Sequence, residues 1–239
     1  MTAPTDVTKI CGATSVADVD AVAAGGASAV GLWWQVPGGR HARDLPLLAT
    51  LAARAAEHGV TTFLVTLCPD PAAVAASARA VRSDAVQLHG YQTPAVVAQV
   101  RRALPAGTTL VKVLHLQDGA SPDARFARAY ASAGTDLFLL DSTVDGRVGS
   151  TGVPPDPAAV RSVADGLPQP FLLAGGLTAR PDPTHRALRD HPGCVGVDVD
   201  GGARVTGRLD AAAVRRIVTT WQPHTDSRTA HPPVGGHTS

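Results

Sequence analysis

Two residues of this chain have side chains suited to proton transfer and stand at the ends of apolar segments. Cys11 ends the run VTKIC, and Asp141 ends the run DLFLLD. A thiolate can accept a proton and a carboxylic acid can donate one, so the two could serve as base and acid on opposite sides of a small substrate. Arg40 adds a cation in the loop PGGRH, and His89 adds an imidazole in QLHG.

Glycine pairs form a second set of candidates. Backbone N–H groups at glycine can approach an anion closely, and glycine-rich loops after late strands are a common phosphate site in barrel enzymes. The predicted phosphate cradle comprises glycines of LLAGGL, VDVDGG and GSTG, namely Gly175, Gly176, Gly201, Gly202, Gly149 and Gly152. Asp198, in VDVDGG, is a further candidate for contact with substrate.

Each candidate also has a purely structural explanation. A buried Cys11 can be a small core residue, and His89 can satisfy backbone hydrogen bonds. Asp141 can cap the turn that follows it, and Arg40 can be a solvated loop cation. The other two cysteines, Cys68 and Cys194, are expected to be structural.

The elements that must position these residues follow from the hydrophobic pattern. Apolar runs alternate with longer Ala- and Arg-rich stretches of helical spacing, which predicts parallel strands joined by right-handed crossovers. We expect an α/β fold, a closed (β/α)8 TIM barrel; an open doubly wound sheet is the alternative, although the first turn, CGATS, lacks GxGxxG. The expected strands cover 7–11, 29–34, 61–67, 85–90, 109–116, 136–141, 170–176 and 195–202.

Helices are expected between these runs, and one domain is expected overall. The pattern indicates helices within 15–26, 44–59, 71–82, 93–104, 122–134 and 210–221. Residues 1–222 form the predicted barrel domain. The segment 223–239 has lost the apolar period and is rich in Pro, Gly, His and Thr, so we expect a disordered C-terminal tail.

The barrel prediction brings the candidate residues together. In such barrels the active site forms at the carboxyl ends of the strands. The thiol, the carboxylate, the cation and the glycine pairs all stand at or just beyond those ends, so they are expected to converge on one barrel mouth. That joint placement favours a functional role over the separate structural explanations.

Composition excludes several classes of partner. The 239 residues carry a formal charge of +1 with scattered Lys and Arg, and only 4% are aromatic, so we expect no nucleic-acid partner and no membrane surface. Three widely spaced cysteines without CxxC or Cys/His clustering favour free thiols in a reducing cytoplasm and no metal site. The N-terminus does not read as a signal peptide, and no apolar stretch is long enough to span a membrane. The oligomeric state is not predicted.

The order of the motifs resembles the phosphoribosylanthranilate isomerase family. KICGAT, QLHG, LLD, GSTG, LLAGGL and VDVDGG follow one another, with an Arg in a Pro/Gly loop after the second strand, over about residues 7 to 220. The combination of KICG, QLHG and AGGL is specific, whereas no single motif is. The resemblance implies a barrel that opens the ribose ring of an N-glycoside and performs an Amadori rearrangement with no metal or organic cofactor.

The resemblance also implies roles for individual residues. Cys11 matches the general base that removes the C2 proton of the ring-opened iminium, and Asp141 matches the general acid that protonates the ring oxygen. Arg40 matches the residue that holds the anthranilate carboxylate, and His89 matches a histidine that lines the site. The glycine pairs and GSTG match the phosphate cradle.

This chemistry sets requirements on two pKa values. Asp141 must be protonated near neutral pH, so burial would have to raise its pKa well above about 4. The pKa of the Cys11 thiol would have to fall from about 8.5 toward neutral, with Lys9 or Lys112 as the candidate cation.

The chain departs from the family at the eighth strand. The family has roughly VDVSSGVE, where this chain has VDVDGGAR, so Asp200 replaces a serine and Arg204 a glutamate. Three explanations are open: Asp200 turns away and pairs with Arg204, Arg204 itself reaches the phosphate, or the ligand carries no phosphate here. Trp33 and Trp34 stand where smaller apolar residues are usual, and strand alternation lets only one of them point into the site.

Three functions are therefore compared. The first is isomerisation of an N-ribosyl arylamine, that is, phosphoribosylanthranilate, in tryptophan biosynthesis. The second is a paralogous isomerase for a different amino-glycoside, with or without a phosphate, in specialised metabolism. The third is a non-catalytic ligand-binding barrel, whose function Cys11→Ser and Asp141→Asn would leave untouched.

Overall fold

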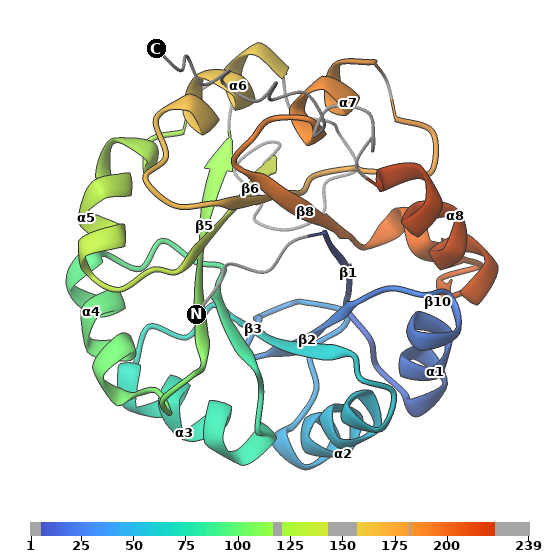
Figure 1. Ribbon diagram of the computed structural model, residues 1–239. Helices are drawn as coiled ribbons and strands as arrows, with labels where there is room; N and C mark the ends of the chain where they lie inside the picture. The colour runs from blue at the N-terminus through green and yellow to red at the C-terminus, as the bar shows by residue number, and fades with distance from the viewer. Residues whose placement is uncertain (1–5, 117–120, 143–156, 182, 223–239) are drawn as a thin grey trace, which may run out of the picture.

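A closed parallel barrel of eight strands forms the centre of the molecule (Figure 1). The computed structural model describes residues 6–116, 121–142, 157–181 and 183–222. The strands pair in chain order, and the last, β8, closes on the first, β1, with Lys9 opposite Asp198 in the register. The strands are β1 (Val7–Cys11), β2 (Ala29–Trp34), β3 (Thr61–Thr66), β4 (Ala85–Leu88), β5 (Thr109–Leu116), β6 (Leu137–Ser142), β7 (Phe171–Leu173) and β8 (Cys194–Val199). The predicted barrel is confirmed, and the open sheet is wrong.

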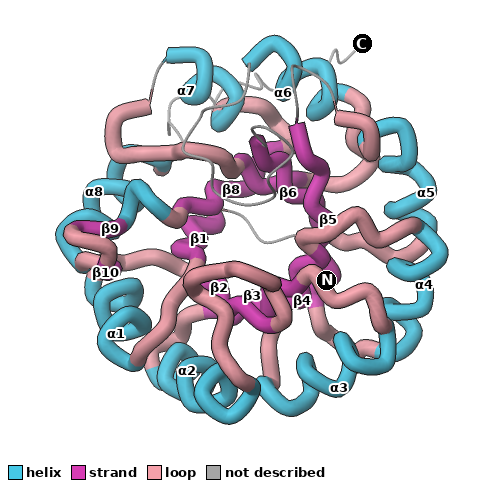
Figure 2. The backbone as a smooth tube through the Cα atoms, turned by 180° about the vertical axis from the view of Figure 1, so that it is seen from behind, coloured by secondary structure: helices cyan, strands magenta, loops and turns pink. Residues whose placement is uncertain are grey.

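Helices surround the barrel as an outer ring (Figure 2). They are α1 (Val16–Ala24), α2 (Leu45–Glu57), α3 (Pro71–Val81), α4 (Pro94–Ala103), α5 (Ala127–Ser132), α6 (Pro157–Asp165), α7 (Pro183–Arg189) and α8 (Ala211–Trp221). The sequence pattern did not single out α6 and α7. Short 3-10 turns cover Ala124–Phe126 and Gly201–Ala203, and a small hairpin, β9 (Arg204–Val205) and β10 (Arg208–Leu209), follows β8.

Side-chain caps define where several helices begin. Ser15, Asp44, Asp70, Thr93 and Asp210 each accept a hydrogen bond from a backbone N–H of the first helical turn. Helices α2, α3 and α4 also carry proline in their first turn, where its missing N–H costs nothing. These local signals make the loop-to-helix boundaries predictable from sequence.

Alternation along the strands sorts side chains into two cores. In β5, Val111 and Val113 point into the barrel, while Leu110 and Leu114 face the helices. Residues in register on neighbouring parallel strands share a face. The polar residues at the strand ends that continue the inward alternation therefore also point into the barrel. The inner core consists of Val7, Ala29, Phe63, Ala85, Val111, Val113, Leu137, Leu139, Leu172 and Ala174.

The strand ends depart from the predicted bounds where glycine takes over. The expected strands 170–176 and 195–202 are too long, since β7 ends at Leu173 and β8 at Val199. Gly175 and Gly176 have φ of 92° and 65°, which strand geometry does not allow. The predicted tail 223–239 lies outside the described residues, so the domain boundary stays a prediction. Within the described part of the chain, no helix is long and apolar enough to cross a membrane.

Candidate active site

A pocket of about 230 Å³ opens at the carboxyl ends of the strands. Cys11 at the end of β1 and Asp141 near the end of β6 both line it, which brings the predicted base and acid to one cavity. The other lining residues come mainly from the loops after β7 and β8. They are Trp33, His89, Ala174, Gly175, Gly176, Leu177, Thr178, Asp198, Asp200, Gly201 and Gly202.

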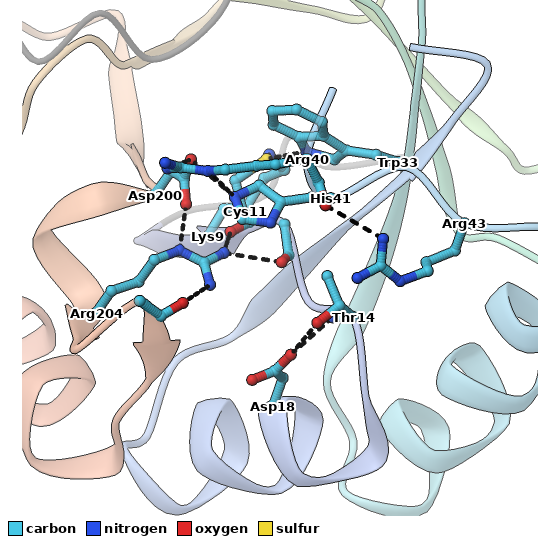
Figure 3. Close-up of polar contacts among 12 residues, drawn as sticks. Lys9, Cys11, Thr14, Asp18, Trp33, Arg40, His41, Arg43, Asp200 and Arg204 are labelled. Atoms are coloured by element: carbon cyan, nitrogen blue, oxygen red, sulfur yellow. Dashed lines mark hydrogen bonds and ion pairs between the residues drawn. The ribbon is translucent and has the colours of Figure 1, made fainter. Parts of the chain in front are cut away.

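Two nitrogen donors hold the sulfur of Cys11. The Lys9 ammonium donates to Sγ at 3.2 Å, and the Trp33 indole N–H donates to it at 3.1 Å (Figure 3). Gly31 on the neighbouring strand makes room for them, because a Cβ there would lie 2.6 Å from Sγ and 3.1 Å from the Lys9 Nζ. The Cys11 thiol therefore belongs to a polar site with two specific hydrogen-bond donors, and it is not simply a small core residue.

A buried ion pair joins the first and last strands beneath the thiol. The Lys9 Nζ lies 2.8 Å from Asp198 Oδ2, and the Lys9 side chain is fully buried. Burial alone lowers the pKa of Lys9, but the charge of Asp198 and the hydrogen bonds to Asp198 and Cys11 outweigh burial and raise it, so the amine stays protonated. The second carboxylate oxygen of Asp198 has no hydrogen-bond partner among the described residues, and Asp198 faces the pocket.

The expectation that the pKa of Cys11 is lowered is wrong. Burial raises the pKa of the thiol to about 12, and the negative charge of Asp198 adds to this effect. The predicted cation, Lys9, is present and acts in the opposite direction, as does the indole of Trp33, but neither outweighs burial. Lys112 is not that cation, because its ammonium donates to the carbonyls of Gly90 and Val113.

Asp200 pairs with Arg204, as the first of the three explanations expects, but it does not turn away from the pocket. The Arg204 Nε donates to Asp200 Oδ1 at 2.7 Å (Figure 3). Burial raises the pKa of Asp200, but contacts with His41 and Arg204 more than offset it and lower the pKa to about 2. The Arg204 Nη atoms donate to the carbonyls of Cys11, Gly12 and Gly207.

These contacts make Arg204 a clamp between the β8 loop and the end of β1. Its guanidinium is committed to Asp200 and three carbonyls, so it does not line the pocket. Asp200 does line the pocket, which leaves a paired carboxylate, rather than a serine hydroxyl, beside the glycine turn.

Arg40 lies beside the pocket rather than in its lining. Its Nη2 is 3.3 Å from Asp200 Oδ2, and its Nε donates to His41 Nε2 at 2.9 Å. Because a guanidinium only donates, the His41 Nε2 accepts from Arg40, and the same nitrogen lies 3.4 Å from Asp200 Oδ2. The Arg40 side chain is 66% exposed. Its predicted contact with a substrate carboxylate stays a prediction.

The opposite wall of the pocket carries His89 and Asp141. The His89 Nε2 lies 3.7 Å from Asp141 Oδ2, too far for a direct hydrogen bond, and its Nδ1 is 3.1 Å from the Gln87 amide nitrogen. Burial lowers the pKa of His89 well below its ordinary value, and nearby His115 adds to this, so the ring is neutral. A Gln87 donor leaves the His89 proton on Nε2, toward Asp141.

The glycines after β7 and β8 that the sequence predicts as an anion cradle line the pocket, and their role as a cradle stays a prediction. Within the described residues, the N–H groups of Gly175, Gly176, Gly201 and Gly202 donate no hydrogen bond. Gly202 also lets the two loops touch, because a Cβ there would lie 2.4 Å from the Leu177 carbonyl oxygen. The last two members of the predicted cradle, Gly149 and Gly152, lie outside the described residues.

Several site residues escaped the sequence interpretation. Gln87 and His41 were not named, and Lys9 was named only as one of two possible cations. Gln87 stands two residues before His89, as Lys9 does before Cys11, so strand period alone could have placed both on the inward face. Of the two tryptophans, Trp33 lines the pocket and Trp34 packs against the outer core, as alternation predicts.

Fold and site together define a class: a (β/α)8 barrel with a thiol and a carboxyl group on one pocket, and glycine N–H groups at its rim. Within the described residues, no group of three His, Cys, Asp or Glu could hold a metal ion. The family model described as N-(5'-phosphoribosyl)anthranilate (PRA) isomerase matches residues 8–220. The chain belongs to this isomerase family, so it is an enzyme of the aldose–ketose isomerase type and not a non-catalytic barrel.

Individual relatives agree with the family match. The chain is 38% identical to N-(5'-phosphoribosyl)anthranilate isomerase of Halorubrum lacusprofundi over 213 residues, which covers 88% of this chain and 94% of the relative. It is 37% identical to that of Chromohalobacter salexigens over 227 residues, covering 92% and 96%.

Solved structures share the fold. The phosphoribosyl anthranilate isomerase of Thermus thermophilus superposes with a TM-score of 0.72 at 23% identity, covering 90% of this chain and 97% of that one. Another isomerase of this name, in complex with reduced 1-(o-carboxyphenylamino)-1-deoxyribulose 5-phosphate, gives a TM-score of 0.69 at 20% identity, covering 90% and 98%.

Proposed function

We propose that this chain converts N-(5'-phosphoribosyl)anthranilate to 1-(o-carboxyphenylamino)-1-deoxyribulose 5-phosphate. The observation that supports it is the placement of Cys11 and Asp141 on one pocket whose rim carries glycine N–H groups without partners among the described residues. The reaction moves hydrogen within one molecule: C1 of the sugar is reduced and C2 is oxidised. It needs one proton donor and one proton acceptor and no external oxidant.

Asp141 acts first, as the general acid. It gives its proton to the furanose ring oxygen, the C1–O bond breaks, and the nitrogen lone pair forms the C1=N iminium. His89 stands 3.7 Å from the Asp141 carboxyl as a neutral imidazole, so it adds no positive charge that would favour the carboxylate. The desolvated carboxyl, 4% exposed, suits an acid that must be protonated at the start.

Cys11 acts second, as the base that removes the C2 proton. The electrons of the C2–H bond form C1=C2, and the iminium π electrons return to nitrogen. The resulting enolamine takes up a proton at C1 while its C2 hydroxyl loses one, which gives the ketone. The thiol starts protonated, because its pKa is about 12. An iminium cation in the pocket would oppose the field of Asp198 and favour release of the thiol proton to solvent, which leaves the thiolate that this step needs.

The glycine cradle is the proposed phosphate site. Gly175 and Gly176 follow β7, and Gly201 and Gly202 open the 3-10 turn after β8, where early N–H groups lack internal partners. Arg204 neutralises Asp200 at this rim, which reduces the repulsion that a lone carboxylate would exert. Arg40 can exchange Asp200 for the anthranilate carboxylate, since its side chain is largely exposed.

The test follows the fluorescence of freshly generated phosphoribosylanthranilate. Purified protein should abolish it, whereas Cys11→Ser and Asp141→Asn, each shown to be folded, should act far more slowly. A flat trace at high enzyme concentration would refute the proposal. A cytoplasmic location and the absence of a nucleic-acid partner stay predictions.

One observation favours a second candidate, an isomerase for an unphosphorylated amino-glycoside. Asp200 lines the pocket as an ionised carboxylate. Inhibition by inorganic phosphate separates the two candidates. Competitive inhibition that weakens in Gly201→Ala supports a phosphate site at the cradle, and the absence of any inhibition favours the second candidate.

A further inference from the structure

The indole of Trp33 is the second N–H donor to the sulfur of Cys11. Its Nε1 lies 3.1 Å from Sγ, and the ring itself lines the pocket (Figure 3). The resemblance to the isomerase family implies a smaller apolar residue at this position, which has no N–H. The donor is therefore a feature of this chain and not part of the motif pattern that identified the base.

The loop after β2 holds the indole in place. The backbone N–H of Arg43 donates to the Trp33 carbonyl at 3.0 Å, and Ala42 bridges to Trp33 in parallel register. Gly39 passes directly over the ring, because a Cβ there would lie 3.1 Å from the indole Cε3. The His41 ring meets the indole at 79°, with centroids 5.0 Å apart. A ring enclosed in this way has little freedom to leave the sulfur.

The indole nitrogen can only donate a hydrogen bond, so the contact favours the form of Cys11 that is the better acceptor. A thiolate has three lone pairs and accepts two N–H donors readily, whereas a thiol accepts weakly and must place its own proton elsewhere. A hydrogen bond to the ionised form favours that form over the neutral one. Lys9 supplies the other donor from beneath, so the two nitrogens approach the sulfur from different strands.

We propose that Trp33 is a positioning residue for Cys11, whose indole N–H orients the sulfur toward the pocket and stabilises the thiolate that removes the C2 proton. The contact operates in the same direction as Lys9 and against burial and Asp198. It is neutral and carries no counter-charge, so it adds stabilisation without attracting the substrate's anionic groups. The catalytic part of this inference depends on the proposed function, but the thiol–indole contact does not.

The first experiment measures alkylation of Cys11 by iodoacetamide between about pH 7 and about pH 10, with peptide mass spectrometry to separate it from Cys68 and Cys194. Trp33→Phe keeps an aromatic ring but loses the donor. A hydrogen bond to a charged group is expected to be worth roughly one to two pKa units, so the rate at a given pH should fall about 10- to 100-fold. Trp34→Phe, one residue along and facing the outer core, is the matched control and should leave the rate unchanged.

A second measurement does not depend on whether Trp33→Phe folds well. The chain has three tryptophans, so protein labelled with ¹⁵N-tryptophan gives three indole signals. Cys11→Ala should shift the Trp33 indole signal and leave that of Trp221, which donates to the Thr178 carbonyl, in place. An unmoved set of signals, or a Trp33→Phe alkylation profile that overlies the wild type or shows faster alkylation at every pH, would overturn the inference.

The outcomes also separate this inference from the proposed function. If phosphoribosylanthranilate is not converted while the thiol profile still depends on Trp33, the proposed function fails and the contact stands. If turnover is normal and Trp33→Phe changes neither the thiol profile nor the pH dependence of kcat, the positioning role fails and the isomerase stands.

Discussion

Both walls of the pocket contain buried titratable groups, but these groups are stabilised in different ways on the two walls. On the wall made by β1, β2 and β8, oppositely charged side chains form buried pairs: Lys9 with Asp198, and Asp200 with Arg204, which lies behind the pocket lining. On the wall made by β4, β5 and β6, the histidines are neutral because burial disfavours their charged form. The wall that carries the proposed base thus holds buried ion pairs beside a desolvated thiol, whereas burial keeps the histidines beside the proposed acid neutral.

Backbone contacts strengthen the difference. On the acid side, three buried donors hold the carbonyls of the loop after β4: His115 contacts His89 O at 2.8 Å, Lys112 donates to Gly90 O at 2.9 Å, and Tyr130 donates to Gln92 O at 3.0 Å. The loop that presents His89 is therefore fixed through its main chain. On the base side, side chains contact the sulfur directly, so substitutions there should change reactivity as well as position.

The largest expected effect tests whether both walls are needed for catalysis. Asp141→Asn and Cys11→Ser should each lower kcat roughly 10²- to 10⁴-fold, because each removes one proton transfer. The double variant should lose less than the product of the single losses, since the residues serve successive steps of one reaction. Stopped-flow loss of substrate fluorescence measures all three. A double variant that loses the full product would mean that the two residues act independently.

The next effect concerns the stability of the charged wall. Lys9→Met should lower the free energy of unfolding by about 3–5 kcal/mol, because it leaves Asp198 buried without its partner. Urea unfolding at pH 7 measures this. The control is Arg54→Met, which breaks an exposed pair with Asp20 and should cost no more than about 1 kcal/mol. Equal losses in both variants would contradict the idea that the ion pair at the base is buried and essential.

The neutral histidines on the wall made by β4, β5 and β6 should make the free energy of unfolding depend on pH. Burial lowers the pKa of His115 to about 4, against about 6.5 in the unfolded chain, so the unfolded state binds a proton that the folded state does not. Stability is therefore retained above the unfolded pKa and is lost as the pH falls from about 6.5 toward 4, by at most about 1.4 kcal/mol per pH unit. His115→Gln, which keeps an N–H donor but does not titrate, should recover up to about 2 kcal/mol of the loss between pH 7 and pH 5.

Urea unfolding at the two pH values measures that difference. His58→Gln is the control, because His58 lies at the surface beside Asp20 and is not a desolvated ring. If His115→Gln and the wild type lose stability in parallel, His115 is protonated in the folded protein, and the contrast between the two walls does not hold.

The sequence predicts the strands, the helices and the residues on the pocket better than it predicts the protonation states of those residues. Alternating apolar runs and cap residues such as Asp44 and Asp210 act locally, so barrel, strands and most helices were predictable. Strand-end position placed Cys11 and Asp141 on the pocket. The thiol pKa was not predictable, because it depends on burial and on Asp198, a residue 187 positions along the chain, which the closing of β8 on β1 brings near.

Contacts between loops were also beyond the sequence. Asp200 and Arg204 are only four residues apart, so their pairing could be proposed from the sequence, where it is one of three explanations. The contact of Asp200 with Arg40 spans 160 residues, and no local pattern indicates it. The short β7 was overestimated because an apolar run does not show where glycine φ angles turn positive.

The smallest expected effect lies at the rim between the two walls, where two adjacent glycines differ. A Cβ on Gly201 meets nothing within 4 Å, whereas one on Gly202 would lie 2.4 Å from the Leu177 carbonyl oxygen. Gly201→Ala should leave stability nearly unchanged and raise KM a few-fold, because a methyl group at the pocket lining crowds the proposed phosphate site. Gly202→Ala should separate the β7 and β8 loops and cost about 1–3 kcal/mol of stability as well. Steady-state kinetics and thermal unfolding of the pair measure this, and identical behaviour would mean that loop contact does not shape the cradle.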